Sequence, residues 1–423
     1  MKNRFKYFLL LLITPAIALA EEQINQANTA WVLTSTALVL FMTLPGLALF
    51  YGGLVRSKNI LTVLMQCFSI ACFISIIWVV IGYSLAFGNG GEYNAWIGGL
   101  DKVMLKGITT DSVFSGIPET VFVMFQMTFA IITPALIVGG FAERIKFSAM
   151  LLFSCLWLIF VYTPVCHWVW AEGGWLYSRN VMDFAGGTVV HINAGVAALV
   201  AAVIVGKRKG FHETAMMPHN LTMTVTGAAM LWVGWFGFNA GSALAANGSA
   251  GMAMLVTHIG AATGAISWIT IEWIRYGKPS VLGIVTGMVA GLGTITPASG
   301  FVDPMGAMII GFTAGIVCYF ATQFIKNVVK IDDSLDVFPV HGVGGILGTV
   351  MAGFLAVEYA EGVTMSSQVQ TQLIAVGAVF LWSLVISAIL LKTIDLVMGL
   401  RPSLEDEISG LDIALHEESG YNI

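Results

Sequence analysis

No charged residue interrupts the stretch from Thr214 to Ile271, TAMMPHNLTMTVTGAAMLWVGWFGFNAGSALAANGSAGMAMLVTHIGAATGAISWITI. A helix crosses a bilayer with about 20 apolar residues, so this stretch is too long for a single crossing. The turn-forming sequence Asn247-Gly248-Ser249 divides it into two segments. The stretch therefore predicts two consecutive transmembrane helices.

The rest of the chain has the same character. Of its 423 residues, 57% are hydrophobic and 10% are charged, whereas about 25% is usual for charged residues in soluble domains. The mean hydropathy of +0.86 excludes a soluble enzyme and also a membrane β-barrel, whose strands alternate polar and apolar residues. Stretches with few or no charges lie at 30–53, 60–88, 119–141, 147–170, 187–206, 218–240, 251–274, 280–296, 304–325, 338–357 and 370–391. We predict an all-α polytopic membrane protein with eleven transmembrane helices.

The distribution of Lys and Arg residues predicts how these helices are oriented across the membrane. Thirteen of the nineteen fall in one set of alternating loops and in the C-terminal tail, three fall in the opposite loops, and three precede the first helix. Cytoplasmic loops of membrane proteins carry the excess of Lys and Arg. We therefore expect the N-terminus outside and the C-terminus inside, in a bacterial cytoplasmic (inner) membrane.

The N-terminal segment resembles a targeting sequence. Met1–Ala20 has a basic start, an apolar run and a small-residue site that ends at Ala20, which predicts a cleaved signal peptide. An uncleaved first helix is the alternative.

The odd number of helices suggests two inverted five-helix repeats, at about 30–206 and 218–357, plus an eleventh outer helix at about 370–400. Such repeats place a transport site at their interface. Together they form a membrane domain over residues 21–400. Residues 401–423 are a polar, acidic tail with four apolar residues that suit a docked segment, Leu404, Ile408, Leu411 and Ile413. A disordered end is the alternative for the tail.

Two histidines lie within the predicted helices, and their presence there calls for a functional explanation, because a charged side chain at the bilayer centre costs about 2.5 to 3.5 kcal/mol or more. His191 and His341 each follow an Asp, Asp183 and Asp336, in the last helix of a proposed repeat. Inverted symmetry would bring them together, where two imidazoles can share a hydrogen bond and pass a proton. Metal ligation is the competing use, but two histidines without a further ligand are an incomplete set.

Aromatic residues are too abundant for any one of them to stand out by composition. Trp170 ends the fourth helix, and Phe129 and Phe238 lie in the third and sixth, the latter close to Ser242. A Trp at a membrane edge is usually an interface anchor. Facing a vestibule, it would instead bind a cation through its ring.

Three motifs carry a resemblance to a known family. They are DFAGGTVVHINAG (Asp183–Gly195), GWFGFNAGS (Gly234–Ser242) and DDSLDVFPVHGVGG (Asp332–Gly345), supported by FYGGLVRSKN (Phe50–Asn59), GGFAERIKF (Gly139–Phe147) and GLDIALHEESGY (Gly410–Tyr421). With these motifs in this order, the chain resembles the Amt/Mep/Rh ammonium transporter family over nearly its whole length, and its bacterial Amt branch in particular. One departure is Pro339, where many relatives have Gly.

The resemblance implies an ammonium transporter or channel, not an enzyme, with no cofactor, no metal and no nucleic acid partner. It implies a homotrimer with one hydrophobic pore in each subunit. By motif, His191 and His341 match the twin histidines of the pore, and Phe129 and Phe238 match its phenyl gate. Phe129, Trp170 and Ser242 match the outer ammonium-recruiting site, and Asp183 matches a structural support near that site.

The expected mechanism is recruitment of ammonium, its deprotonation, conduction of ammonia and a proton relay through the histidines. An ammonium sensor, a passive ammonia gas channel and an intramembrane metalloenzyme are the alternatives. The matching tail further implies a cytoplasmic PII-type nitrogen regulatory protein as partner.

Overall fold

The computed structural model describes residues 23–421, and the signal peptide predicted at Met1–Ala20 lies outside this range. Within the described part of the chain, eleven helices are long and apolar enough to cross a membrane. This confirms the predicted number and order. The first five spans are Gln26–Leu54 (α1, Gln26–Phe41; η1, Met42–Leu47; α2, Ala48–Leu54), Ser57–Phe87 (η2, Ser57–Asn59; α3, Ile60–Ile77; η3, Trp78–Gly82; α4, Tyr83–Phe87), Glu119–Phe141 (α5), Phe147–Trp170 (α6, Phe147–Trp157; η6, Leu158–Tyr162; α7, Thr163–Trp170) and Gly187–Val205 (η8, Gly187–Ile192; α8, Asn193–Val205).

The second half of the chain supplies the remaining six spans. They are Leu221–Gly241 (α9), Gly248–Tyr276 (α10), Val281–Ala298 (α11, Val281–Ile295; η9, Thr296–Ala298), Pro304–Val329 (α12, Pro304–Gln323; η10, Phe324–Val329), Phe338–Leu355 (η11, Phe338–Gly342; α13, Val343–Leu355) and Met365–Met398 (α14). Short 3-10 turns occur in the loops at Gly91–Tyr93 (η4), Val103–Leu105 (η5) and Tyr177–Arg179 (η7). The uncharged stretch from Thr214 to Ile271 forms α9 and α10 as predicted, and the Asn247 side chain caps α10 by accepting from Ala250 N.

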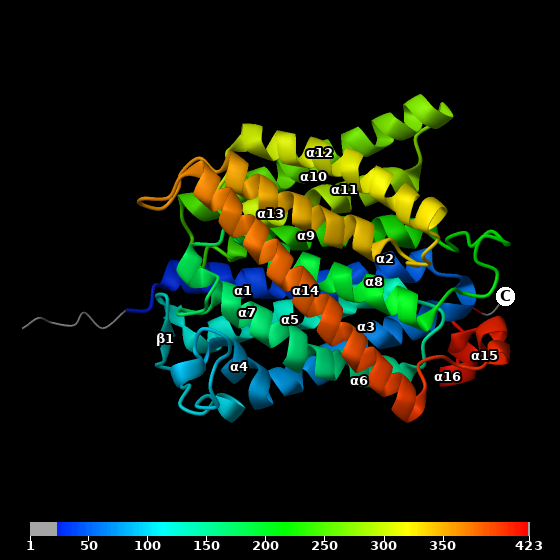
Figure 1. The fold of residues 1–423 in the computed structure, drawn as a ribbon, viewed down its shortest axis with the longest axis horizontal. Coiled ribbons are helices and arrows are strands. Elements are labelled where there is room, and N and C mark those ends of the chain that lie inside the picture. Colours follow the sequence, from blue (N-terminus) through cyan, green and yellow to red (C-terminus); the bar gives the residue numbers. More distant parts are fainter. Residues whose placement is uncertain (1–22, 422–423) are drawn as a thin grey trace, which may run out of the picture.

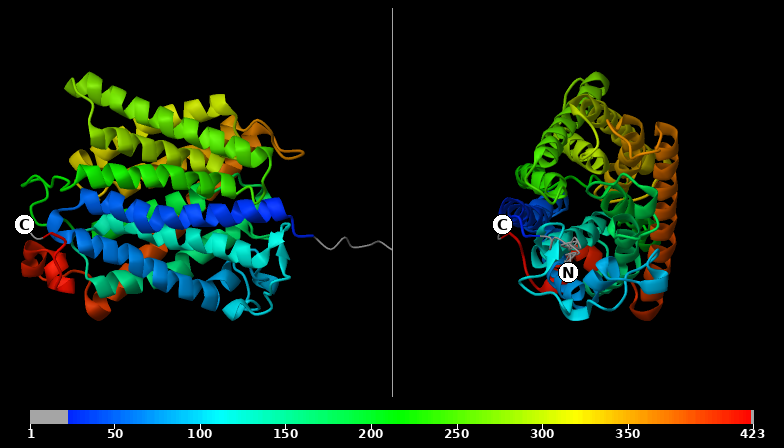
Figure 2. Two further views of the ribbon diagram at one scale, coloured as in Figure 1. Left: turned by 180° about the vertical axis from the view of Figure 1, so that it is seen from behind. Right: turned by 90° about the vertical axis from the view of Figure 1, so that its left-hand side faces the viewer.

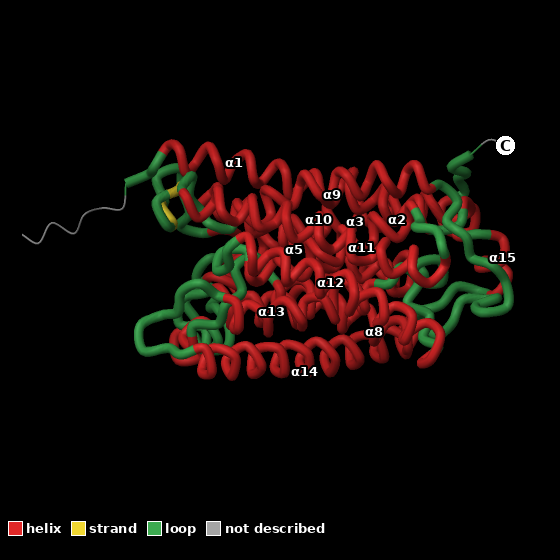
Figure 3. The backbone as a smooth tube through the Cα atoms, turned by 90° about the horizontal axis from the view of Figure 1, so that it is seen from above, coloured by secondary structure: helices red, strands yellow, loops and turns green. Residues whose placement is uncertain are grey.

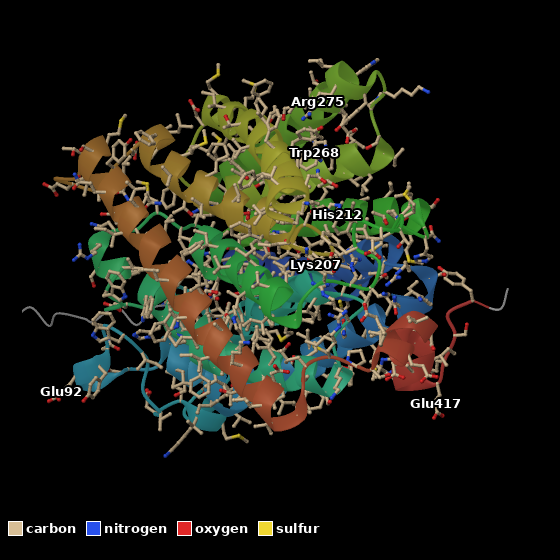
Figure 4. All side chains as sticks on the ribbon, turned by 45° about the vertical axis from the view of Figure 1, so that its right-hand side comes forward. Glu92, Lys207, His212, Trp268, Arg275 and Glu417 are labelled. Carbon is tan, nitrogen blue, oxygen red and sulfur yellow. The ribbon has the colours of Figure 1, made fainter. Side chains whose placement is uncertain are left out.

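The helices run side by side along the long axis of the molecule (Figure 1). The described chain starts at the end that carries the hairpin β1 (Val113–Phe114) and β2 (Ile117–Pro118), and it finishes at the opposite end beside α15 (Leu404–Ser409) and α16 (Leu411–His416). Opposite ends follow from an odd number of crossings. In Figure 4 the labelled Glu92 and Glu417 mark these two ends.

The eleventh helix, α14, crosses the outside of the bundle obliquely (Figure 1) and stands at its edge in the end-on view (Figure 2, right). Figure 3 shows it along one border of the molecule. Many of its apolar side chains are exposed, among them Leu373, Leu381 and Ile389. This arrangement agrees with the predicted outer helix.

The small hairpin is the one departure from an all-helical fold within residues 23–421. β1 and β2 pair antiparallel through Phe114 and Ile117. The two turn residues between them, Ser115 and Gly116, both have positive φ angles, 50° and 73°. This is the type of two-residue turn whose twist suits a tight hairpin.

The fifth and tenth spans touch at glycines. A Cβ atom on Gly195 would lie 2.3 Å from the backbone N of Gly342, and one on Gly345 would lie 2.8 Å from the carbonyl O of Gly187. Only glycine permits such a close approach of two backbones. These contacts join the last helices of the two predicted repeats; the inverted relation between the repeats stays a prediction.

Ion pairs join the loops at the end that bears the tail. Glu143 pairs with Arg56 at 2.8 Å and with Arg208 at 3.2 Å, and Arg208 also reaches Asp332 at 2.7 Å. Burial by itself would raise the pKa of Glu143, but the charges of Arg208 and Arg56 outweigh it and hold that pKa below its ordinary value. The cluster ties together four loops that come from both halves of the chain.

The tail is ordered and docked through residues 401–421, but three of its four proposed apolar anchors are wrong. Leu411 is buried, whereas Leu404, Ile408 and Ile413 are more than half exposed. The contacts are polar instead. The Asp412 carboxylate accepts from the backbone N of Leu61 and of Thr62 at the start of α3, at 3.0 and 2.7 Å.

Glu407 makes a second polar contact from the tail. Its carboxylate accepts from the backbone N of Lys209 and pairs with Arg401. Glu407 thus holds a loop, whereas Asp412 lies at the start of α3, where a carboxylate satisfies free N–H groups and the positive end of the helix dipole. These polar contacts explain why the tail docks without a large apolar face.

Candidate functional site

A large cavity opens at the end of the bundle that bears the hairpin. It measures about 870 Å³ and is lined by Phe125, Gln126, Trp170 and Ser242 among others. The Ser242 hydroxyl donates to the carbonyl O of Phe238 at 2.8 Å, so its own oxygen lone pairs remain available to accept from a ligand. We call this cavity the outer vestibule.

Trp170 lies between the vestibule and the interior. Its Nε1 donates to the carbonyl O of Asp183 at 2.9 Å, and its ring meets that of Phe129 edge to face at 5.7 Å between centroids. The indole is therefore held by the protein and borders the vestibule. This position differs from that of an interface anchor facing lipid.

Two phenyl rings lie behind the vestibule wall, next to Phe125 and Trp170. Phe129 from α5 and Phe238 from α9 have ring centroids 4.3 Å apart and an angle of 30° between their planes. Both side chains are about 1% exposed. The structure therefore brings together the two residues that the sequence motifs paired.

Asp183 organises the turn that begins the fifth span. One carboxylate oxygen accepts from the backbone N of Gly186 and of Gly187, at 2.8 and 2.5 Å. The other accepts from the N and the hydroxyl of Thr188 and, at 3.3 Å, from Val189 N. Since the first N–H groups of a helix lack partners inside the helix, this carboxylate supplies them. His191 lies in the same turn, η8.

The two histidines meet below the phenyl rings. His191 Nδ1 lies 3.1 Å from His341 Nδ1, and the rings are nearly parallel, at 13°. Both are buried, and each lies in a π-helical turn, η8 or η11. With Nδ1 facing Nδ1, one ring must donate and the other accept, so the pair holds one shared proton when neutral.

The passage along the histidines is narrow and apolar. The space lined by Phe238, Trp235, His191, His341 and Leu231 measures about 10 Å³, which is at the lower limit for a single water molecule. The indole of Trp235 stacks on His191 at 5.6 Å between ring centroids. A hydrated ion has no room here without rearrangement.

Below the histidines, a second cavity of about 140 Å³ opens toward the tail end. His341, Tyr51, Lys326 and Asp336 border it, and Lys326 Nζ pairs with Asp336 at 2.7 Å. The second carboxylate oxygen of Asp336 is buried without a hydrogen-bond partner among the described residues. We call this cavity the inner vestibule.

The tenth span begins after Asp336, as predicted, and a second carboxylate close by caps it. Asp333, not Asp336, caps η11, because its carboxylate accepts from Phe338 N at 2.7 Å. Asp333 stands eight residues before His341, as Asp183 stands eight before His191. This equal spacing was a signal that the motif offered. Burial and the neighbouring Asp336 raise the pKa of Asp333 to about 7.

Pro339 fits this turn without distortion. It occupies one of the first two positions of η11, where a missing backbone N–H removes no hydrogen bond within the helix.

Within residues 23–421 no group of three or more His, Cys, Asp or Glu side chains is arranged to hold a metal ion. His167, outside the pair, is held by two backbone carbonyls, Ala86 O at 2.9 Å and Asn94 O at 2.6 Å. His258 packs against the ring of Trp232 on an outer face of the bundle. The histidine pair therefore stands apart from the other intramembrane histidines in its setting.

A family model described as Ammonium Transporter Family matches residues 30–421. The chain belongs to this family. An ammonium transporter from Aquifex aeolicus is 47% identical over 410 residues, covering 96% of this chain and 95% of that protein. Ammonium transporter Amt1 from Archaeoglobus fulgidus is 45% identical over 94% of this chain and its own full length.

Solved structures of the ammonium transporter family agree with the fold. Mep2 from Saccharomyces cerevisiae superposes with a TM-score of 0.84 at 35% identity, over 91% of this chain and 90% of that one. A protein described as "Sensor Amt Protein" superposes with a TM-score of 0.87 at 29% identity, over 92% and 98% of the two chains. Family membership makes the chain a multi-pass membrane transporter rather than an enzyme.

Proposed function

We propose that this ammonium transporter recruits ammonium in the outer vestibule, removes its proton, and conducts ammonia past the two histidines while they relay the proton. The observation that carries the proposal is the contact of His191 Nδ1 with His341 Nδ1 at 3.1 Å beside a space of about 10 Å³. A proton path and an apolar passage too small for a hydrated cation lie side by side.

Recruitment rests on the chemistry of the vestibule wall. The Trp170 ring lines the vestibule and offers a face to a cation, a contact worth about 2 kcal/mol when desolvated, and Ser242 offers an oxygen that accepts from N–H. The Phe129 ring lies behind Trp170, at 5.7 Å between ring centroids, and does not line the vestibule. Ammonium has four N–H donors, whereas potassium has none. Sodium is more strongly hydrated and loses more on leaving water.

Deprotonation follows from the cost of burying a bare charge in the passage. An isolated ion in an apolar environment loses its hydration, which is far more costly than moving neutral ammonia. The stacked rings of Phe129 and Phe238 must first move apart, because their centroids are 4.3 Å apart and neither is exposed. Transport therefore includes a side-chain motion of this phenyl gate.

The proton takes a separate route through the imidazoles. His191 Nε2 is buried without a hydrogen-bond partner among the described residues, so it is free to accept a proton from the gate side. Transfer across the Nδ1 pair then moves charge to His341, which borders the inner vestibule. Ammonia that arrives there meets water and regains a proton.

The test is a current measurement on the full chain in liposomes, with an ammonium jump compared to an equal potassium jump. We expect an ammonium-selective current that His191→Ala combined with His341→Ala abolishes. His258→Ala is the matched control, because this histidine also lies within a span but on an outer face. Ammonium current and selectivity unchanged in the double variant would contradict the relay.

Two other functions give different signals in the same liposomes. A passive ammonia channel would alkalinise the lumen without current. A sensor is favoured by one observation, the likeness to the protein described as "Sensor Amt Protein", and it would give neither signal while still binding ammonium.

We further propose a homotrimer in a bacterial inner membrane, with the tail in the cytoplasm, the signal peptide removed and a PII-type regulatory protein docked at the tail end. The distribution of Lys and Arg supports this orientation. Exposed apolar side chains on α10 and α12, such as Leu255 and Phe312, suit contacts with lipid or another copy.

Three measurements test this setting. Native mass spectrometry gives the number of chains, and labelling of an added N-terminal tag on intact cells gives the orientation. Deletion of residues 405–423 should abolish PII capture. Capture and transport both unchanged by the deletion would remove the regulatory role of the tail.

A further inference from the structure

We propose that Trp235 is a positioning residue for proton transfer, which stabilises His191 in its protonated form and is itself held by a buried chain of hydrogen bonds. The proposal rests on the relay through the histidines, in which His191 takes the proton of ammonium. Trp235 lines the narrow passage together with both histidines and is 3% exposed. Its indole ring lies nearly parallel to the His191 ring, at 15°, with 5.6 Å between the ring centroids.

The two histidines have different aromatic neighbours. Within residues 23–421, the indole of Trp235 stacks on His191 and not on His341, and the Phe238 ring lies 6.1 Å from the His191 ring between centroids. A desolvated cation within about 6 Å of the centroid of an indole is attracted by the electrons of the ring. These neighbours therefore favour a positive charge on the histidine that lies next to the phenyl gate.

This charge arises when ammonium gives up its proton. One N–H bond of ammonium breaks, its electron pair stays on the nitrogen to give ammonia, and the proton forms a new N–H bond at His191 Nε2. That nitrogen is buried without a hydrogen-bond partner among the described residues, and Nδ1 of the same ring faces His341 Nδ1. The imidazole is only 1% exposed. Because water does not reach the new charge, the neighbouring indole contributes to its stabilisation.

A buried chain of hydrogen bonds fixes the indole in this place. Trp235 Nε1 donates to the Thr296 hydroxyl oxygen at 2.8 Å, and this hydroxyl donates to the carbonyl O of Leu292 at 2.8 Å. Asn239 Oδ1, one turn further along α9, lies 3.3 Å from the same hydroxyl, and Asn239 Nδ2 donates to the Thr257 hydroxyl at 2.9 Å. The chain joins α9 with α10 and with the turn η9. The indole therefore cannot rotate away without leaving a buried N–H unpaired.

The test separates charge from ammonia in liposomes that contain the full chain. An ammonium jump is followed by the current, which reports the proton, and by the luminal pH, which rises when ammonia enters without a proton. Trp235→Leu removes the ring, and we expect about tenfold less current, with luminal alkalinisation beyond that of wild-type and of protein-free liposomes. Trp235→Phe keeps a ring without Nε1, and we expect a smaller loss, of about threefold.

A second variant tests the anchor of the indole. Thr296→Val has nearly the same shape but cannot accept from Trp235 Nε1, so we expect about threefold less current, again with alkalinisation. Trp232→Leu is the matched control, because Trp232 lies on the same helix but packs against His258 and does not line the passage. Its current and luminal pH should equal those of the wild-type protein.

A third comparison asks whether the indole acts through His191. In the His191→Ala background, Trp235→Leu should change neither the current nor the luminal pH, because the group that it stabilises is already absent. Two residues that act as one unit show such non-additive effects. A further loss of current in this background would overturn the positioning role.

The remaining outcomes also decide the proposal. Unchanged current and luminal pH in Trp235→Leu would overturn it, and so would an equal loss of current and of ammonia entry, because the indole would then only shape the passage. Should Trp235→Leu fail to fold, the same two results in Thr296→Val decide the question. Absence of an ammonium current from the wild-type protein would contradict the relay itself, so the two failures are distinguishable.

Discussion

Replacement of Asp183 by Asn should destabilise the protein and abolish transport together. The carboxylate receives five hydrogen bonds from Gly186, Gly187, Thr188 and Val189, two at one oxygen and three at the other. An amide keeps one acceptor oxygen and turns the other position into an N–H donor. In the less damaging orientation, the oxygen serves the three donors and the amide N–H₂ faces Gly186 N and Gly187 N.

The size of the loss follows from these two backbone groups. A buried N–H left without a partner costs about 1 to 3 kcal/mol, so two of them amount to about 2 to 6 kcal/mol. Asp183 is only 5% exposed, which leaves water little access to replace the lost partners. Because His191 lies in the same turn, the strain also moves the imidazole away from its partner.

Asp303→Asn is the matched control for the same chemical change. Asp303 caps α12 by accepting from Gly306 N at 2.8 Å, and it is exposed. Asn and Asp are nearly equal as caps, so we expect a change below about 0.5 kcal/mol. Unfolding by SDS in mixed micelles, followed by circular dichroism, measures both variants. Equal stabilities of the two variants, within about 1 kcal/mol, would refute this account of the Asp183 turn.

Three further predictions concern other parts of the fold. The pKa of Asp333 is raised from 3.8 to about 7, so between these pH values the folded state binds more protons than the unfolded state, and the free energy of unfolding falls as pH rises from about 4 to 7. Asp333→Asn should lessen this fall when SDS unfolding is measured at pH 4, 5.5 and 7. An identical dependence of stability on pH in the variant would contradict the raised pKa of Asp333. Asp412→Ala removes the acceptor for the backbone N–H groups in the first turn of α3 and should make the tail several-fold more sensitive to protease. Glu405→Ala, at an exposed position, should leave the digestion rate unchanged. Equal digestion rates of the two variants would argue against docking through the Asp412 carboxylate. Gly195→Val should prevent folding, because its Cβ would lie 2.3 Å from the backbone N of Gly342 in the tenth span. Gly251→Val is the control, since no atom lies within 4 Å of a Cβ there. Comparable yields of monodisperse protein from the two variants would count against the tight crossing of the fifth and tenth spans.

The membrane-spanning helices could be read from the sequence with little error. In hydrocarbon, every backbone N–H and C=O must find its partner inside its own segment, so a long apolar run becomes a helix regardless of its neighbours. The stretch from Thr214 to Ile271 is an example, since its break at Asn247 is a local turn signal that the structure retains. For His191 and His341, which are 150 positions apart, spacing alone left metal ligation as a competing use, and the family resemblance implied the pair.

Other features depended on contacts that no local pattern contains. Asp333 and Asp336 both precede His341, and only the packing shows that Asp333 caps the turn while Asp336 borders the inner vestibule. The tail was expected to dock through apolar residues, yet Asp412 holds it, because the free N–H groups it satisfies belong to a helix some 350 positions earlier. The spacing of apolar residues along a segment does not predict polar contacts of this kind.

The sequence by itself therefore determined the class of protein, the number and order of its helices and the residue types available for transport, because helix formation in a membrane is decided within each segment. Only the tertiary structure decided which faces of those helices meet. It brought His191 Nδ1 within 3.1 Å of His341 Nδ1 and narrowed the passage beside them to about 10 Å³. These are outcomes of packing between distant segments, where close backbone contacts such as that of Gly195 with Gly342 set the distances.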